Sequence, residues 1–251
     1  MTKRYIIPAL FLLSTFSLKA QFTEAIEDNS FFIEEAYNQE EGVVQHIFTG
    51  SGVSDALFTE ANFTQEWPAF GQTHQVSITI PYLYSSTLDG IGDFLLNYRY
   101  QLTNENGLAV SPRFSLIIPT GDDAKGLGDG VVGVQLNLPV SKRWHDEFIT
   151  HFNAGLTMLP NVYNGTRRET QTEYFLGASG IYLANKNFNL MAEILYTVQN
   201  GSDELIFNPG VRFAIDIGNL QIVPGLAFPI IYTSGRQESG MFLYLSFEHP
   251  F

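Results

Sequence analysis

The chain of 251 residues contains no cysteine, so it can form no disulfide and cannot carry a lipid on an N-terminal cysteine. After residue 20 it also lacks any apolar run of the roughly 20 residues that a transmembrane helix requires. Basic residues are few, because 13 Lys and Arg stand against 26 Asp and Glu and give a net charge of −13. These absences argue against a disulfide scaffold, a helical membrane protein and a nucleic-acid partner.

Segments that alternate between apolar and polar residues fill most of the remaining sequence. They predict twelve β-strands, since successive side chains of a strand point to opposite faces. The expected ranges are 42–49, 55–66, 73–84, 91–103, 108–119, 130–141, 147–159, 172–184, 187–199, 204–217, 219–232 and 240–251. Strands of soluble sandwiches usually run about 5–6 residues, and several of these segments are about twice as long. This length favours an all-β fold, a single transmembrane antiparallel barrel over residues 42–251.

The last strand ends on an aromatic residue, Phe251. Met241, Leu243, Leu245 and Phe247 form its apolar face, and the other face carries Tyr244, Ser246 and Glu248. The segment looks like the closing strand of a bacterial outer-membrane barrel. Its terminal aromatic resembles the signal that the barrel-assembly machinery reads, so this machinery is an expected partner.

The N-terminus points to export. Lys3 and Arg4 precede a short apolar run, residues 6–16, which predicts a secretory signal peptide over residues 1–20 with cleavage after Ala20. The alternative, a retained anchor, is disfavoured because the run is too short for a membrane helix. The expected location is the outer membrane of a Gram-negative cell, reached through the periplasm.

Residues 21–41 are acidic and do not alternate. Residues 31–37 predict one or two helical turns, capped by Asn29 or Ser30. Three roles stay open for this segment: a plug in the barrel mouth, a docking element for a partner, or a loosely tethered periplasmic leader.

The connections between the strands are expected to alternate in length. Counting back from Phe251, the short ones fall at 217–219, 184–187, 142–146 and 103–107. The longer ones fall at 232–240, 199–204, 160–172, 120–130 and 84–90. Short periplasmic turns and longer outer loops are typical of outer-membrane barrels. Aromatic residues near the strand ends predict an interfacial girdle. Its members are Trp67, Tyr82, Trp144, Tyr232, Phe247 and Phe251. The alternative is hairpin-end packing in a soluble sheet.

Two stretches carry a family resemblance. Gly90-Ile91-Gly92-Asp93 opens an alternating strand that ends in Tyr98-Arg99-Tyr100, and residues 112–122 run Pro-Arg-Phe-Ser-Leu-Ile-Ile-Pro-Thr-Gly-Asp before the glycine-rich residues 126–130. Together they resemble the outer-membrane proteins of the phenol-degradation meta-pathway family over about 90–144. The resemblance implies a roughly twelve-stranded barrel that forms a channel for small, often hydrophobic molecules. The family name is not evidence for phenol as the substrate.

Polar and charged residues gather on the inward parity of the strands. The pore-lining candidates are Asp93, Asn97, Arg99, Arg113, Gln135, Asn137, Glu193, Arg212, Asp216 and Glu248, with His151 and Asn153 on the same parity. Such residues either line a water-filled path or pair across a filled interior. The sequence favours a pore with a constriction near Arg99, Arg113 and Arg212, and a structural ion-pair network stays open.

Two other chemistries are disfavoured. A lipid-modifying enzyme would need Ser179, His151 and Asn153 within hydrogen-bond reach, which nothing in the sequence fixes. Residues 120–130 lack the spaced ligands and closing glutamate of a calcium loop. The sequence therefore predicts a non-enzymatic channel for small-molecule solutes, without cofactor, in a lipid bilayer. A non-conducting structural or partner-binding barrel is the alternative.

Overall fold

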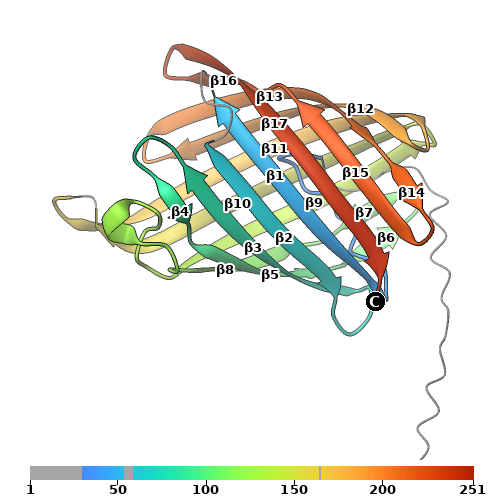
Figure 1. Cartoon of the computed structure of the whole chain (residues 1–251), viewed down its shortest axis with the longest axis horizontal. Coiled ribbons are helices and arrows are strands. Elements are labelled where there is room, and N and C mark those ends of the chain that lie inside the picture. The colour runs from blue at the N-terminus through green and yellow to red at the C-terminus, as the bar shows by residue number, and fades with distance from the viewer. Residues whose placement is uncertain (1–29, 54–58, 164) are drawn as a thin grey trace, which may run out of the picture.

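The chain folds into a closed antiparallel β-barrel (Figure 1). The computed structural model describes residues 30–53, 59–163 and 165–251. Within these ranges the one helix is a short 3-10 turn, η1 (Asp123–Lys125), and none is long and apolar enough to cross a membrane. The predicted all-β barrel is confirmed.

In the described part of the chain, seventeen strands make one continuous sheet. They are β1 (Val43–Val53), β2 (Glu60–Pro68), β3 (His74–Tyr84), β4 (Asp89–Ile91), β5 (Phe94–Tyr100), β6 (Thr103–Glu105), β7 (Leu108–Val110), β8 (Arg113–Ile118), β9 (Gly133–His145), β10 (Phe148–Tyr163), β11 (Arg168–Asn185), β12 (Phe188–Gln199), β13 (Ser202–Phe213), β14 (Ile215–Ile217), β15 (Leu220–Ala227), β16 (Ile230–Thr233) and β17 (Arg236–Pro250).

The seventeen strands form twelve staves of the barrel, where a stave is one full barrel strand, either continuous or interrupted. β4, β5 and β6 are one interrupted stave, as are β7 with β8, β13 with β14, and β15 with β16. The barrel closes because β1 pairs with β17, from Val43 opposite Pro250 to Val53 opposite Gly240, and also with β2. A closed ring leaves no strand edge unpaired, which is what a barrel in lipid requires.

The twelve predicted strands correspond one by one to these staves, but most staves are longer than predicted. β11 begins at Arg168 where 172 was expected, and β17 begins at Arg236 where 240 was expected. The helical turns predicted over residues 31–37 are wrong, because this stretch makes only bends.

The longer strands shorten two connections that were predicted to be long outer loops. Residues 200–201 and 234–235 are two-residue turns, with φ of 51° and 85° in the first and 44° and 82° in the second. Positive φ at both central residues is the turn geometry that fits the twist of two hairpin strands. Among the connections that the structure describes in full at the barrel end away from Pro250, the longest is residues 119–132, which we call the long connection.

Asp93 fixes this long connection against the wall. Its Oδ1 accepts a hydrogen bond from Gly121 N at 2.8 Å, and its Oδ2 accepts one from Asp129 N at 2.9 Å. A Cβ at Gly128 would overlap the same carboxylate. The glycine and aspartate motifs of residues 90–93 and 119–130 therefore belong to one structural unit, in which Asp93 holds the long connection in place.

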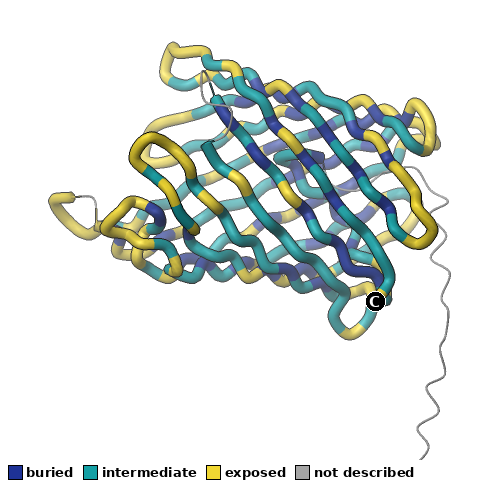
Figure 2. Tube along the Cα trace, in the orientation of Figure 1, coloured by how far each residue is buried: buried dark blue, intermediate teal, exposed yellow. Residues whose placement is uncertain are grey.

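Burial alternates along the staves (Figure 2). On β5, Leu96 and Tyr98 are exposed, whereas Asn97 and Arg99 are buried. The outer surface is thus apolar and the interior holds most of the buried polar side chains, the reverse of a soluble protein. This arrangement aims the inward residues at a common space, in which the candidate site lies.

Candidate functional site

Residues 30–41, which we call the inner segment, lie inside the barrel just before β1. Gln39 N donates to Gln75 Oε1 of β3 at 2.6 Å, and Phe31 N donates to Glu193 Oε1 of β12 at 2.8 Å. β3 and β12 are six staves apart in the ring of twelve, so they stand on opposite walls. The inner segment therefore crosses the lumen from wall to wall.

Glu193 holds the far end of the inner segment. Its Oε1 accepts hydrogen bonds from three successive backbone N–H groups, those of residues 31–33, at 2.8, 3.0 and 3.1 Å. Its Oε2 accepts from Asn208 Nδ2 at 2.7 Å. Converging N–H groups stabilise a carboxylate in place of water, which a buried charge requires. A bend stands here where the sequence predicted helical turns, because Asn153 and Ser141 of the wall, and not carbonyl groups four residues earlier, accept the N–H groups of Glu34 and Ala36.

The middle of the inner segment is held through its backbone. Asn153 Oδ1 accepts from Glu34 N at 2.9 Å, and Asn153 Nδ2 donates to Glu34 O at 2.8 Å. Ala36 N donates to Ser141 Oγ at 2.7 Å, while Ala36 O accepts from Ser111 Oγ at 2.6 Å. Wall side chains thus satisfy backbone groups that would otherwise be buried without partners.

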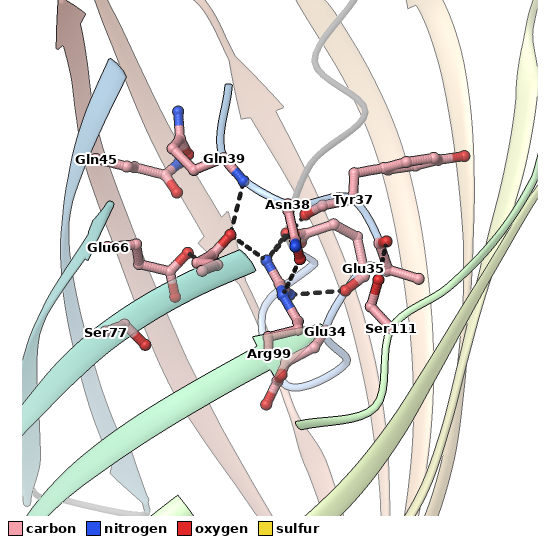
Figure 3. Close-up of polar contacts among 12 residues, drawn as sticks. Glu34, Glu35, Tyr37, Asn38, Gln39, Gln45, Glu66, Ser77, Arg99 and Ser111 are labelled. Carbon is pink, nitrogen blue, oxygen red and sulfur yellow. Dashed lines mark hydrogen bonds and ion pairs between the residues drawn. The ribbon is translucent and has the colours of Figure 1, made fainter. Parts of the chain in front are cut away.

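Arg99 is the centre of the contacts on the β3–β5 wall (Figure 3). Its Nη1 donates to the carbonyl oxygen of Glu35 at 2.9 Å, and its Nη2 lies 3.3 Å from Glu35 Oε1. Its Nε donates to Asn38 Oδ1 at 3.1 Å, and Nη2 also donates to the carbonyl of Tyr37 and to Gln75 Oε1, both at 2.9 Å. The side chains of Arg99 and Glu35 are each 4 % exposed. Such a buried pair is costly to break from one side.

A second ion pair lies on the neighbouring stave. Arg113 Nε donates to Glu34 Oε2 at 3.0 Å, and Arg113 Nη2 lies 2.7 Å from Glu34 Oε1. Arg113 stands directly opposite Arg99 in the pairing of β5 with β8. Its side chain is 11 % exposed and that of Glu34 is 30 % exposed, so this pair is the more open of the two.

Aromatic packing joins the inner segment to the other side of the lumen. The rings of Phe31 and Phe242 lie 5.4 Å apart, those of Phe32 and Phe242 4.9 Å, and those of Phe31 and Tyr244 6.1 Å. We call the buried cluster that receives them the apolar wall. It consists of Ile47, Ala214, Val223, Ala227, Phe242 and Tyr244.

Three glycines in the strands leave room for the inner segment. A Cβ at Gly177 would overlap Ile33 Cδ1, and one at Gly210 would overlap Phe31 Cε2. At Gly225 it would come within 2.8 Å of Phe31 Cε1. Glycine weakens a strand interior unless another part of the chain approaches closely. These glycines therefore make space in the wall for the side chains of the inner segment.

Six of the predicted lumen residues lie around the inner segment, directly or through a neighbour. Arg99, Arg113 and Glu193 bond to it, whereas Asn97, Gln135 and Asn137 bond to the wall residues that touch it. The cross-strand pairing places Arg99 directly opposite Arg113, two of the three arginines of the predicted constriction. Arg212 lies on a different wall, fully buried, with its guanidinium carbon 5.7 Å from the centre of the Tyr244 ring.

The remaining three candidates make other contacts. Asp93 holds the long connection. Glu248 Oε1 accepts from Gln45 Nε2 at 2.5 Å, across the seam between β1 and β17. Asp216 is exposed near the barrel end and accepts from Gln221 Nε2 at 2.9 Å.

The sequence did not identify the acidic partners of the arginines. Glu34 and Glu35 were noted only as part of an acidic stretch. Their signal in the sequence is a pair of adjacent carboxylates, which matches the pair of inward arginines on neighbouring strands. Register alone could not reveal the pairing, because the path of residues 30–41 depends on the closed barrel around them.

The three residues considered for an enzyme do not form a hydrogen-bonded triad. His151 and Ser179 stand opposite each other on β10 and β11, yet Ser179 Oγ accepts from Ser30 Oγ at 2.7 Å. His151 Nδ1 bonds to Ser141 Oγ at 2.7 Å, and Asn153 holds the inner segment. In the part of the chain that the structure describes, no cluster of three or more His, Asp or Glu is placed to hold a metal ion.

The predicted girdle residues lie near the two barrel ends. Tyr82 and Tyr232 are close to the ends of β3 and β16, and both are exposed. Trp67, Trp144 and Phe247 lie toward the end that holds Pro250, where Trp144 Nε1 donates to Thr150 Oγ1 at 3.0 Å. Phe251 follows β17 and is exposed.

The fold recurs in solved outer-membrane channels. An outer membrane channel from Pseudomonas putida F1 matches with a TM-score of 0.64 and 13 % identity, over 86 % of this chain and 98 % of that chain. The NanC porin matches with a TM-score of 0.57 and 10 % identity, over 80 % and 98 %. The KdgM porin matches with a TM-score of 0.56 and 11 % identity, over 82 % and 99 %. At these identities the likeness shows the barrel fold. No protein-family model matches the chain, and no curated protein does.

Proposed function

We propose that the chain is an outer-membrane channel for small molecules whose lumen is closed at rest by the inner segment. The observation that carries this proposal is the crossing of the lumen by residues 30–41, bound to Gln75 on one wall and Glu193 on the opposite wall. A segment held on both walls blocks the direct path. Passage of a solute then requires that the segment moves aside.

Several features support a location in the outer membrane. The outward parity is apolar along the staves, and the barrel has the fold of known channels. Aromatic residues near both barrel ends suit the headgroup regions of a bilayer. The proposal includes a signal peptide over residues 1–20, cleaved after Ala20, and recognition of the strand that ends in Phe251 by the barrel-assembly machinery.

The contacts of the inner segment suit reversible release. They are mostly hydrogen bonds from its backbone to wall side chains, and water can replace each of them once the lumen opens. When Phe31 and Phe32 leave, the apolar wall becomes free to contact a solute. Small hydrophobic or aromatic molecules are therefore the proposed solutes.

Single-channel recording tests the proposal. The purified protein and a variant lacking residues 30–41 are reconstituted in planar bilayers. The parent is expected to be closed for most of the recording, and the deletion variant to conduct in steady discrete steps. A third variant, in which residues 30–41 are replaced by a glycine–serine stretch of equal length, separates loss of the contacts from loss of the chain itself.

A non-conducting structural or partner-binding barrel is the second candidate, and one observation favours it. The pair of Arg99 with Glu35 is almost fully buried, which is typical of a fixed interior network. The same recordings decide between the two. A deletion variant that folds, as shown by heat-modifiable migration on a gel, and yet stays silent would contradict the channel proposal.

A further inference from the structure

Arg113 presents a guanidinium group that the wall holds independently of the inner segment. Its Nη1 donates to Asn97 Oδ1 at 2.9 Å and also to Ser115 Oγ, and its Nη2 donates to Gln135 Oε1 at 2.7 Å. Gln135 is held in turn, because its Nε2 donates to Thr157 Oγ1 at 2.9 Å. These partners belong to the barrel strands, so the guanidinium keeps its position when the inner segment moves.

The carboxylate of Glu34 occupies the open edge of this guanidinium. Both of its oxygens are engaged, with Oε2 at 3.0 Å from Arg113 Nε and Oε1 at 2.7 Å from Arg113 Nη2. Two parallel contacts to one carboxylate are the usual way in which arginine recognises carboxylate ligands. Any other carboxylate that reached this edge could form the same two contacts.

Exposure separates this pair from its neighbour. The side chains of Arg113 and Glu34 are 11 % and 30 % exposed, whereas both side chains of the pair between Arg99 and Glu35 are 4 % exposed. A dissolved anion therefore reaches the pair of Arg113 with Glu34 more readily than the pair of Arg99 with Glu35. Arg113 is thus the more accessible cation of the two.

We propose that Arg113 is the binding site for a carboxylate group of the transported solute, and that Glu34 is its resident occupant. This inference rests on the proposed channel function and specifies its solute as a carboxylate anion. Exchange of one carboxylate for another keeps both contacts to the guanidinium, so little interaction is lost at Arg113. Because the solute competes with Glu34, its binding favours the state in which the inner segment is released.

Calorimetric titration with benzoate tests the inference, with the neutral isostere benzamide as the comparison ligand. The purified full barrel is used as the parent, as E34Q, as R113Q and as the double variant. E34Q removes the tethered competitor and is expected to lower the benzoate dissociation constant by roughly tenfold or more. In the R113Q background, Glu34→Gln is expected to have no effect on benzoate. Benzamide affinity is expected to be the same in all four proteins.

Matched controls keep the test specific. Glu238→Gln removes a carboxylate from an exposed ion pair with Arg236 and is expected to leave benzoate affinity unchanged. Arg113→Lys keeps the charge without the paired donors, and is expected to bind benzoate more weakly than the parent while folding normally. Equal benzoate affinity in the parent and E34Q, or in E34Q and the double variant, would overturn the inference.

The outcomes also separate this inference from the channel proposal. If deletion of residues 30–41 opens the pore but the benzoate titrations show no dependence on Glu34 and Arg113, the carboxylate site is wrong and the channel stands. If the deletion variant is silent and the titrations behave as expected, the channel is wrong and Arg113 remains an anion-binding site of a closed barrel.

Discussion

The two walls that hold the inner segment do so by different means. On the wall formed by β3, β5 and β8, which we call the arginine wall, two arginines bind two consecutive carboxylates, Glu35 and Glu34. On the apolar wall, the rings of Phe242 and Tyr244 pack against Phe31 and Phe32, and the neighbouring backbone N–H groups are held separately by Glu193 on β12. The arginine wall holds the inner segment by directional, charged contacts, and the apolar wall holds it mainly by apolar contacts.

This difference suggests a division of roles. Ion pairs and hydrogen bonds depend on geometry, so the arginine wall fixes the register of the inner segment. Apolar contact is not directional and scales with the area removed from water, so the apolar wall supplies adhesion that tolerates small shifts. Substitutions in the arginine wall should therefore misplace the inner segment, whereas substitutions in the apolar wall should weaken its attachment.

The largest effect is expected from Arg99→Gln. This change leaves the Glu35 carboxylate buried without its cation, and such losses cost about 3–5 kcal/mol. Unfolding by urea in detergent micelles, followed by tryptophan fluorescence, measures the change. Arg236→Gln, which breaks a pair whose arginine side chain is 80 % exposed, is the control and should stay close to the parent. Equal stability of the two variants would remove the special role of the arginine wall.

Phe31→Ala tests the apolar wall. The ring packs against Phe242 and Tyr244, and its loss is expected to lower the free energy of unfolding by about 2–3 kcal/mol, less than for a fully buried phenylalanine. The same variant should raise the open probability in single-channel recordings. Phe70→Ala is the matched control, because this ring is 99 % exposed. A closed, stable Phe31→Ala barrel would show that the apolar wall does not retain the segment.

The smallest effect is expected from Gly177→Ala. Its added methyl group would overlap Ile33 Cδ1, and overpacking of this size costs about 1 kcal/mol or somewhat more. Gly180→Ala on the same strand is the control, since its nearest neighbour, Phe148 Cζ, is at 3.5 Å. Adding Ile33→Ala should restore opening rates and stability to those of Ile33→Ala alone. If the effects of the two substitutions simply added, the close contact between Ile33 and Gly177 would not contribute to holding the inner segment.

The strands were predictable because each carries its own signal. Residues 94–100 alternate in the sequence, and the same residues alternate between exposed and buried in the barrel. The ends of strands were less predictable, as residues 202–203 and 236–239 show: they are polar, yet they continue the pairing beyond the apolar stretch. Hydrogen bonds to the neighbouring strand, which no local pattern reveals, decide where these strands stop.

The candidate site was predictable only in part. The inward parity identified Arg99, Arg113 and Glu193 as lumen residues, since direction follows from a period of two. Their partners in residues 30–41 were not assigned, and the predicted helical turns were wrong. In this stretch the acceptors for backbone N–H groups come from Glu193 and Asn153, which are more than a hundred residues away in the chain.

By itself, the sequence determined the class of fold, the number of staves and the face on which each strand residue lies, because alternation and turn residues are local properties. Only the tertiary structure decided what the lumen contains. The closed ring brings β3, β5 and β12 around one short segment, and the hydrogen bonds of that segment join residues far apart in the chain. Contacts of this kind exist only once the barrel has closed, so no stretch of sequence encodes them alone.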